Sequence, residues 1–525
     1  MSFNLLEKPW IPVTERPGSV AQYNILDVLK KAQNLLEINE PSPLMQFGLY
    51  RFLVAFVMDA FQIRDPNDVE SLIDANQFEE QTLDSYGKKW LDRFDIFDET
   101  HPFYQSRSNL SQEKQKSVAE LFQELPTGTN ITHFTHFGED AHAISPAACA
   151  RALCAIPPFM QAGGQGLSPS VNGIPPIYVL IKGRSLFQTI VLNCCGIDMP
   201  ENTGREPVAW KLDGSIEKGK EINVFSTLQG LTWQPRHVHL IPTDGGICTY
   251  TGLQSDILVK KIIFTKGWKA TGKWRDPNIS YRISKDGPFA LRPQEGREIW
   301  RDTGPLLLLR EGSYTSPNGK FKFDKPRVVQ QFSYLKNSKT IAPDQKLKVD
   351  LYTLRTDQAK IFEWQQEKLA LPLNLIENDA KGHLVQVALD KTEKISWALG
   401  KAIEHMYPRE GKGNDKAFEN LKNLAFFKYW SSLETPFLTD LISLVAEQDE
   451  TNIDAPAKID GAWKEILQKV SKSVIEEVIG HLDANAEMLK KQVSARGLFW
   501  SIFYKMFNEG IAEKESQKSK KKQKK

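Results

Sequence analysis

The sequence predicts an α+β protein: a large mixed α/β N-terminal domain followed by a C-terminal four-helix bundle. Strand-like and helix-like apolar runs alternate without regular order up to Pro372, and beyond it apolar residues recur at helical spacing. Of the 525 residues, 41% are hydrophobic and 25% charged, as is typical of a globular protein with more than one core. We therefore expect a mixed domain over 1–372, a bundle over 373–511 and a disordered lysine-rich tail over 512–525.

Short apolar runs between glycines and prolines characterise the N-terminal domain. Tyr178–Lys182 and Phe187–Leu192 are largely apolar runs of strand length, and both are predicted to be buried strands. The most apolar stretch, Phe47–Phe61, contains Arg51 and Asp59. It is too short and too interrupted to span a bilayer, so it predicts a buried helix and no membrane partner.

Four successive runs after Pro372 predict an antiparallel helical bundle. They are Leu384–Met406, Ala417–Leu433, Asp460–Leu482 and Leu489–Phe507. Pro436 and Gly461 fall near the ends of runs, where helix breakers are expected. The last eight residues, 518–525, include six lysines and no apolar side chain, which is typical of a solvated tail.

Charge and cysteine content narrow the class of protein. The net charge is +2, but residues 512–525 contain seven lysines and two glutamates, so the other 511 residues carry about −3. Any contact with nucleic acid must then come from a local concentration of cations. The five cysteines are sparse and odd in number, and no secretory signal opens the chain, which predicts a reducing, cytoplasmic location.

One segment, Val259–Arg275, concentrates cations and contains no acidic residue. Its cations are Lys260, Lys261, Lys266, Lys269, Lys273 and Arg275, and Phe264, Trp268 and Trp274 stand between them. Cations neutralise phosphates, while aromatic side chains either stack on bases or pack the segment onto the protein. The pattern predicts a loop or hairpin that contacts nucleic acid. The alternative is a β-hairpin whose lysines are merely solvated.

A second feature is the glycine-rich stretch Gly163, Gly164, Gln165 and Gly166. Glycines allow a backbone to come close to a phosphate or to the floor of a groove. The spacing and context are not those of a dinucleotide-binding fingerprint, and an ordinary flexible loop remains the alternative.

A third feature combines metal-ligating residue types. His133, His136, Asp140 and His142 precede Cys149, and such side chains could hold a metal in a nuclease. No HExxH or paired CxxC spacing supports this reading, and no nucleophile or phosphate-loop motif is present. We therefore expect no catalytic activity, no cofactor and no metal; a metal-dependent nuclease and a plain scaffold remain the competing hypotheses.

Several segments, taken in order, resemble one known family. They are Asn4-Leu5-Leu6, Trp10-Ile11-Pro12-Val13, His101-Pro102-Phe103, the stretch 130–137, the glycine loop after Ser145-Pro146, Gly230-Leu231-Thr232-Trp233-Gln234-Pro235 and the stretch Leu354–Ile361. Together they resemble the large subunit of the type I-E CRISPR surveillance complex, Cascade, over essentially the whole chain. No single motif is decisive; their order and spacing carry the resemblance.

The resemblance implies a non-catalytic role in antiviral defence. Such a subunit sits beside the 5′ end of the CRISPR RNA, among the other Cascade subunits. It recognises a short protospacer-adjacent motif (PAM) in double-stranded target DNA and starts the unwinding that forms the R-loop. It also helps to recruit a helicase-nuclease in trans. Sequence matching is left to the guide RNA, as in other CRISPR effectors.

The resemblance also implies site residues. Gly163, Gly164, Gln165 and Gly166 correspond to a glycine loop that approaches the PAM from the minor groove, with Gln165 in place of a glycine of the family. Lys266 is the candidate for a lysine that enters the same groove, and Lys260 and Lys261 are alternatives. With Lys269, Lys273 and Arg275, those two are also candidates for contacts with the DNA backbone. Asn130 and Phe134 correspond to the loop at the guide RNA end.

Gln358 matches a glutamine that relatives insert as a wedge beside the PAM, and Asp357 stands where some relatives have asparagine. The alternative is that Thr356 or Asp357 caps a helix that runs through Ile361, Trp364 and Leu369. Some relatives also have cysteine pairs that suggest zinc. Cys149 and Cys248 fall near those places without CxxC partners, which argues against a zinc site.

Overall fold

The structure is a computed structural model of the chain. It describes all residues except 107–112, 126–141, 164–166, 198–201, 203, 205–206, 213–218, 225, 313, 315–320, 336–345, 358–359, 407–415, 450–451, 483–484 and 523–525. The chain divides into two compact units. Unit 1 comprises Met1–Glu295 and Pro305–Ala370, and unit 2 comprises Gly296–Gly304 and Leu371–Lys525.

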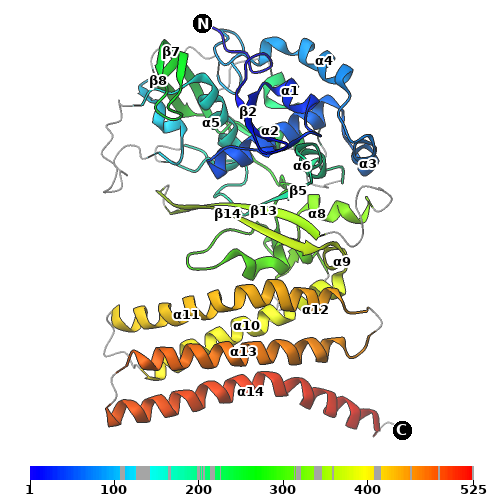
Figure 1. Ribbon diagram of the computed structural model, residues 1–525, viewed down its shortest axis with the longest axis vertical. Coiled ribbons are helices and arrows are strands. Elements are labelled where there is room, and N and C mark those ends of the chain that lie inside the picture. The colour runs from blue at the N-terminus through cyan, green and yellow to red at the C-terminus, as the bar shows by residue number, and fades with distance from the viewer. Residues whose placement is uncertain are drawn as a thin grey trace. The chain divides into compact units, whose positions relative to one another are not determined.

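Unit 1 mixes helices with small sheets (Figure 1). Its helices are α1 (Ile25–Lys30), α2 (Pro43–Ala60), α3 (Pro66–Ala75), α4 (Glu80–Lys89), α5 (Pro146–Phe159), α6 (Leu186–Asn193), α7 (Thr227–Leu231) and α8 (Arg327–Gln330). Its strands are β1 (Ile11–Glu15), β2 (Val20–Tyr23), β3 (Leu35–Ile38), β4 (Gln115–Ser117), β5 (Tyr178–Lys182), β6 (Glu221–Asn223), β7 (Arg236–Ile247), β8 (Gln254–Lys266), β9 (Lys269–Thr271), β10 (Tyr281–Ser284), β11 (Gly287–Ala290), β12 (Lys322–Asp324), β13 (Lys346–Asp357) and β14 (Lys360–Pro372), the last of which ends at the boundary with unit 2.

Helix α2 forms the centre of unit 1. It is buried along nearly its whole length, as the apolar stretch predicted. Its two internal charges are both paired: Arg51 forms an ion pair with Asp276 at 2.7 Å, and Asp59 forms one with Lys211 at 2.5 Å. Pairing of this kind is what allows charged groups to be buried.

The sheets of unit 1 are small and mostly antiparallel. The described strand orders are β2-β1-β3, β11-β10-β12, β14-β13-β5 and β4-β8-β7, and β6 pairs with β9 in parallel. Strand β5 confirms the predicted strand at Tyr178–Lys182. The second predicted strand, Phe187–Leu192, is wrong, because these residues belong to helix α6, capped by the Ser185 side chain, which accepts from the Gln188 amide. Burial on all sides removes the periodicity that would distinguish a helix from a strand.

Unit 2 confirms the predicted helical C-terminal part. It consists of α9 (Leu373–Ile376), α10 (Asp379–Met406), α11 (Lys416–Pro436), α12 (Ile442–Ala446), α13 (Ala455–Gly480) and α14 (Ala486–Lys522). The four long helices correspond to the four runs in the sequence (Figure 1). The tail expected to be disordered over 512–525 is helical through Lys522, since lysine, glutamate, glutamine and alanine all favour helices.

The segment 296–304 belongs to unit 2, although the sequence placed it in the first domain. Trp300 packs against Trp430 and Phe437 at centroid distances of 5.8 and 4.9 Å. Arg297 and Arg301 both pair with Glu393, at 2.6 and 3.0 Å. These long-range contacts have no local sequence signal. A single boundary at residue 372 therefore assigned the segment 296–304 to the first domain.

Candidate nucleic-acid interface

The strand that carries Lys266 is held at the middle of a sheet. Strand β8 pairs with β7 on one side and with β4 on the other. The pairing of β8 with β7 begins at Arg236 opposite Lys266. The next residue, Gly267, donates from its amide to the Pro235 carbonyl at 3.1 Å. A methyl group on Gly267 would lie 2.4 Å from the Arg236 amide nitrogen, so only glycine allows the chain to leave the sheet here.

The lysines of the basic segment differ in their exposure and in their ion pairs. Lys260 and Lys273 are exposed and Lys266 is half-buried, and none of these three forms an ion pair with a carboxylate of the described residues. Lys269 pairs on the surface with Glu221 at 2.6 Å. Lys261 is half-buried in the middle of β8.

Arg275 belongs to the interior. Its side chain is only 11% exposed, lies 3.5 Å from the Asp324 carboxylate and stacks over the Tyr281 ring at 5.3 Å. These contacts connect the end of the basic segment to the β11-β10-β12 sheet. Arg275 is one of the candidates for contact with the DNA backbone, and its guanidinium is already engaged by contacts within the fold.

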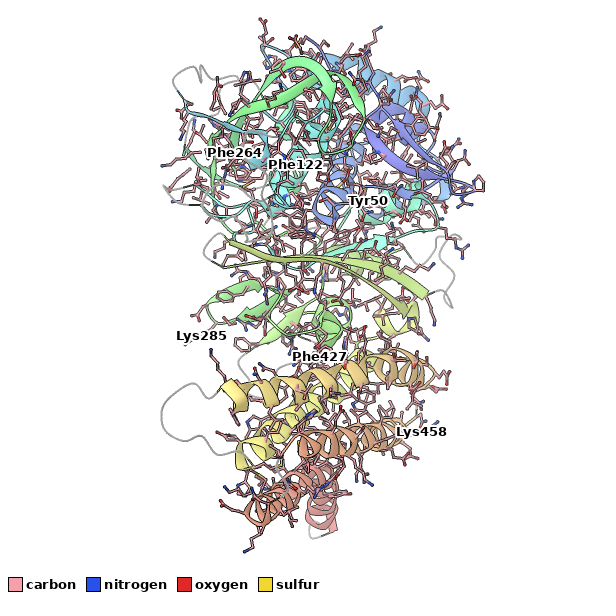
Figure 2. All side chains as sticks on the ribbon, turned by 60° about the vertical axis from the view of Figure 1, so that its left-hand side comes forward. Tyr50, Phe122, Phe264, Lys285, Phe427 and Lys458 are labelled. Carbon is pink, nitrogen blue, oxygen red and sulfur yellow. The ribbon has the colours of Figure 1, made fainter. Side chains whose placement is uncertain are left out.

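The aromatic residues of the basic segment pack inward. Trp268 is buried against Trp233 at a centroid distance of 5.4 Å, and the Trp274 indole donates to the Ser226 carbonyl at 2.9 Å. Phe264 is buried on β8, at one side of unit 1 (Figure 2). Of the two roles considered for these rings, the structure shows packing of the segment onto the protein.

The glycine-rich stretch lies within a loop that is closed at its base. The Ser170 amide donates to the Met160 carbonyl at 2.7 Å, and the Gly163 amide donates to the Leu167 carbonyl at 3.2 Å. A Cβ atom on Gly163 would lie 2.9 Å from Leu167 Cδ1, so this glycine permits a close approach. Gly164, Gln165 and Gly166 lie outside the described residues.

Arg236, the first residue of β7, connects this loop to the β7–β8 hairpin. Its guanidinium donates to the Gln161 carbonyl at 2.5 Å and to the Ser168 carbonyl, one on each side of the glycines. Arg236 is 3% exposed. The structure thus brings the two stems of the glycine loop and Lys266 to the same end of the β7–β8 hairpin.

The third candidate element is the β13–β14 hairpin. β13 ends at Asp357 and β14 begins at Lys360. Gln358 and the Asp357 side chain lie outside the described residues. The alternative reading of a capped helix through Ile361, Trp364 and Leu369 is wrong, because these residues form β14. The Tyr352 hydroxyl donates to Gln46 at 2.6 Å, which ties β13 to α2.

Metal binding receives no support from the described residues. His133, His136 and Asp140 lie outside them, as do Asn130 and Phe134. The described part of the chain, which includes His142, contains no group of three or more ligands arranged to hold a metal ion. Cys149 is fully buried, and burial followed by the nearby Cys248 raises the pKa of its thiol. Cys248 accepts from the Ser145 amide at 3.2 Å, so both cysteines serve the packing around α5.

Sequence reasoning missed Arg236. Arg236 is the first residue of β7. A buried arginine inside such a strand could have been noticed as a group that needs several acceptors. Its acceptors, however, are backbone carbonyls of a distant segment, and backbone carbonyls have no sequence signature.

Comparison with known proteins identifies the family. A family model described as CRISPR-associated protein Cse1 matches residues 4–474. The chain is 25% identical to the CRISPR-associated protein CasA/Cse1 of Thermus thermophilus over 521 residues, which covers 93% of this chain and 94% of that protein.

Solved structures show the same fold. The crystal structure of Thermus thermophilus CasA matches with a TM-score of 0.75 and 21% identity, covering 96% of this chain and all of that one. A chain of a CRISPR RNA-guided surveillance complex matches with a TM-score of 0.73 and 18% identity, covering 95% of this chain and 99% of that one. No helix among the described residues is long and apolar enough to cross a membrane. The chain belongs to the CRISPR-associated Cse1 family, the large subunits of type I-E CRISPR surveillance complexes.

Proposed function

We propose that this protein is the non-catalytic subunit that recognises the PAM in double-stranded DNA, starts duplex unwinding and helps to recruit the helicase-nuclease. Its partners in this role are the other Cascade subunits, the CRISPR RNA and the target DNA, in the cytoplasm. One observation carries the proposal: Lys266 and both stems of the glycine loop meet at one end of the β7–β8 hairpin. A half-buried lysine without a carboxylate partner beside a close-approaching backbone suits a phosphate-lined groove.

Other residues are proposed to make further contacts with the nucleic acids. Lys260 and Lys273 are exposed and would contact phosphates, while Gln358 at the connection of β13 and β14 would act as the wedge. Asn130 and Phe134 would contact the guide RNA end. One of the solved structures with the same fold is a CRISPR RNA-guided surveillance complex, which supports the assignment of this chain to an assembly of the same kind.

The test uses the assembled complex with a defined guide RNA. Duplexes that match the guide and carry randomised flanking bases are bound, sequenced and titrated across salt concentrations. We expect Lys266→Ala to weaken binding to the preferred flanks about tenfold and to lower the salt slope by about one unit, because one phosphate-region contact is lost. Binding of guide-matched single-stranded DNA, which has no duplex to open, should be unchanged.

The matched control is Lys285→Ala, since Lys285 is an exposed lysine of unit 1 in the turn between β10 and β11 (Figure 2). This control should leave flank preference and salt slope unchanged. A complex without any flank preference, or equal losses for Lys266→Ala and Lys285→Ala, would contradict the proposal and favour a plain scaffold. DNA nicking by the chain alone with a divalent metal, abolished by chelator, would favour the nuclease hypothesis.

A further inference from the structure

The Arg236 guanidinium is a deeply buried charged group of unit 1. It is 3% exposed, and its hydrogen bonds go only to backbone carbonyls: those of Gln161, Ser168 and Pro235. No carboxylate of the described residues forms an ion pair with it. The other deeply buried arginines differ in this respect, because Arg51 pairs with Asp276 and Arg151 with Glu40, each at 2.7 Å.

Burial lowers the pKa of Arg236 to about 10, so the group still carries its charge at neutral pH. A buried charge without a counter-ion is costly. Carbonyl dipoles offset part of this cost, and the Nε atom of Arg236 remains without an acceptor among the described residues. The arrangement therefore leaves net positive charge at the base of the glycine loop.

A second cation stands directly opposite. Arg236 pairs with Lys266 across the β7–β8 hairpin, and side chains of directly paired residues emerge on the same face of a sheet. Like charges in this position destabilise a strand pair. Neither cation has a carboxylate partner among the described residues, so a ligand that brings negative charge to this face would relieve the repulsion.

The same face continues along the hairpin. Phe264 lies two residues before Lys266, and the Arg236 guanidinium is 5.8 Å from the centroid of its ring. Lys116, which pairs with Ile262 across β4 and β8, places its ammonium 5.9 Å from the same centroid. Phe264 is 7% exposed, so the Arg236 guanidinium lies beside a buried ring.

The loop itself depends on this guanidinium. Two backbone hydrogen bonds close its base, Ser170 to Met160 and Gly163 to Leu167. Arg236 adds one bond to each stem, at Gln161 and Ser168. The planar guanidinium suits this task because it donates in fixed, diverging directions, whereas a lysine ammonium is a single point.

We propose that Arg236 is a positioning residue for PAM recognition, which fixes both stems of the glycine loop beside Lys266 and holds a positive charge there that DNA phosphate compensates. This inference rests on the proposed function. Arg236 does not touch the bases; it acts through the loop and through Lys266. Its loss should therefore reduce discrimination between flanking sequences, not merely the amount of folded protein.

The experiment measures the ratio of dissociation constants for the least and most preferred flanks, with the assembled complex and the randomised duplexes. We expect Arg236→Met to reduce this ratio by about tenfold or more, which is the scale of one lost base-pair preference. Arg236→Lys keeps the positive charge but lacks the planar guanidinium with its diverging donors, and it should give an intermediate ratio. Guide-matched single-stranded DNA should bind both variants as it binds the wild type.

The matched control is Arg151→Met, which removes another buried arginine of unit 1 and leaves Glu40 without its cation. It should lower the unfolding temperature and leave the flank ratio unchanged. A ratio that falls equally in Arg151→Met, or a loss that is equal on duplex and single-stranded DNA, would show a purely structural role and overturn the inference. If the Arg236→Met protein does not assemble into the complex, the test uses Arg236→Lys instead. A wild-type ratio of dissociation constants in Arg236→Lys would then overturn the inference.

The two proposals fail in different ways. A wild-type complex without flank preference contradicts the proposed function, and the role of Arg236 falls with it. A wild-type complex that discriminates, and in which Lys266→Ala reduces the discrimination while both Arg236 variants retain it, contradicts the positioning role alone.

Discussion

A carboxyl group in unit 1 illustrates how burial changes the chemistry of single residues. Glu124 accepts a hydrogen bond from the Ser42 hydroxyl, and Glu40, which pairs with Arg151 at 2.7 Å, is close enough to interact with it. Burial, followed by the nearby Glu40 charge, raises the pKa of Glu124 from its ordinary 4.5 to about 7.

Glu124 makes the stability of unit 1 dependent on pH. Its pKa is raised in the folded state, so ionisation disfavours folding, and stability falls as pH rises from about 4.5 to about 7. Glu124→Gln keeps the acceptor for Ser42 and cannot ionise. We expect the variant to be more stable than the wild type by roughly 3 kcal/mol at pH 8, and nearly equal to it at pH 4.5. Thermal unfolding of both proteins across this range measures the difference, and parallel curves would contradict the prediction.

At the scale of elements, the long periodic helices of unit 2 were predicted as the correct type, whereas the short buried segment Phe187–Leu192 was not. The helices of unit 2 expose one face and bury another, so their spacing survives in the sequence. Phe187–Leu192 is buried at every position except Gln188, which is half-buried, and its helix could not be distinguished from a strand. The strand β14 was also missed, because Ile361, Trp364 and Leu369 are spaced by 3 and 5 residues, which fits a helical repeat better than the alternation of a strand.

The residues of the candidate site also differ in whether the sequence reveals them. Lys266 and the glycine loop were found because charge and glycine content are visible in sequence. Their position at one end of the same hairpin depends on hydrogen bonds from Arg236 to two backbone carbonyls. These hydrogen bonds leave no signal in the sequence. Because β8 is the middle strand of its sheet, deletion of Val259–Arg275 would destroy that sheet, and point substitutions are the proper test of the basic segment.

The β13–β14 hairpin carries a prediction of its own. Gln358, which lies outside the described residues, stands in the sequence between β13 and β14, two strands of 12 and 13 residues. Opening a base step costs a few kcal/mol, and an inserted amide can satisfy exposed base edges. We expect Gln358→Ala to slow R-loop formation on a fully paired target, and a target with a pre-melted bubble beside the PAM to restore it.

The control for this prediction is Gln365→Ala, a glutamine within β14 whose side chain donates to Glu363. It should behave as the wild type on both targets. An equal defect of Gln358→Ala on paired and pre-melted DNA, measured by footprinting of the displaced strand, would count against the wedge.

At the scale of the whole molecule, the two units are assigned different parts of the proposed function. The proposed DNA contacts all lie in unit 1, before Ala370. Unit 2 needs only one face of each long helix for its core. On α13 the exposed lysines Lys458, Lys469 and Lys472 share one helical face, because they are spaced by 11 and 3 residues. None of them pairs with a carboxylate of the described residues, and Lys458 is seen near one end of the helix (Figure 2).

This face is the part of the bundle that we expect to help to recruit the helicase-nuclease, since unpaired charges at a docking surface mainly steer association. Replacement of all three lysines by glutamate should lower the rate of target degradation by about tenfold, the effect of losing roughly 1.4 kcal/mol of steering and contact. Target binding without the nuclease should change by less than about twofold, because the substitutions leave unit 1 intact. Lys394→Glu, at an exposed position on α10, serves as the control and should degrade the target normally. Equal losses of binding and degradation would instead indicate a defect in folding or assembly, and they would remove the lysine face of α13 from the recruitment surface.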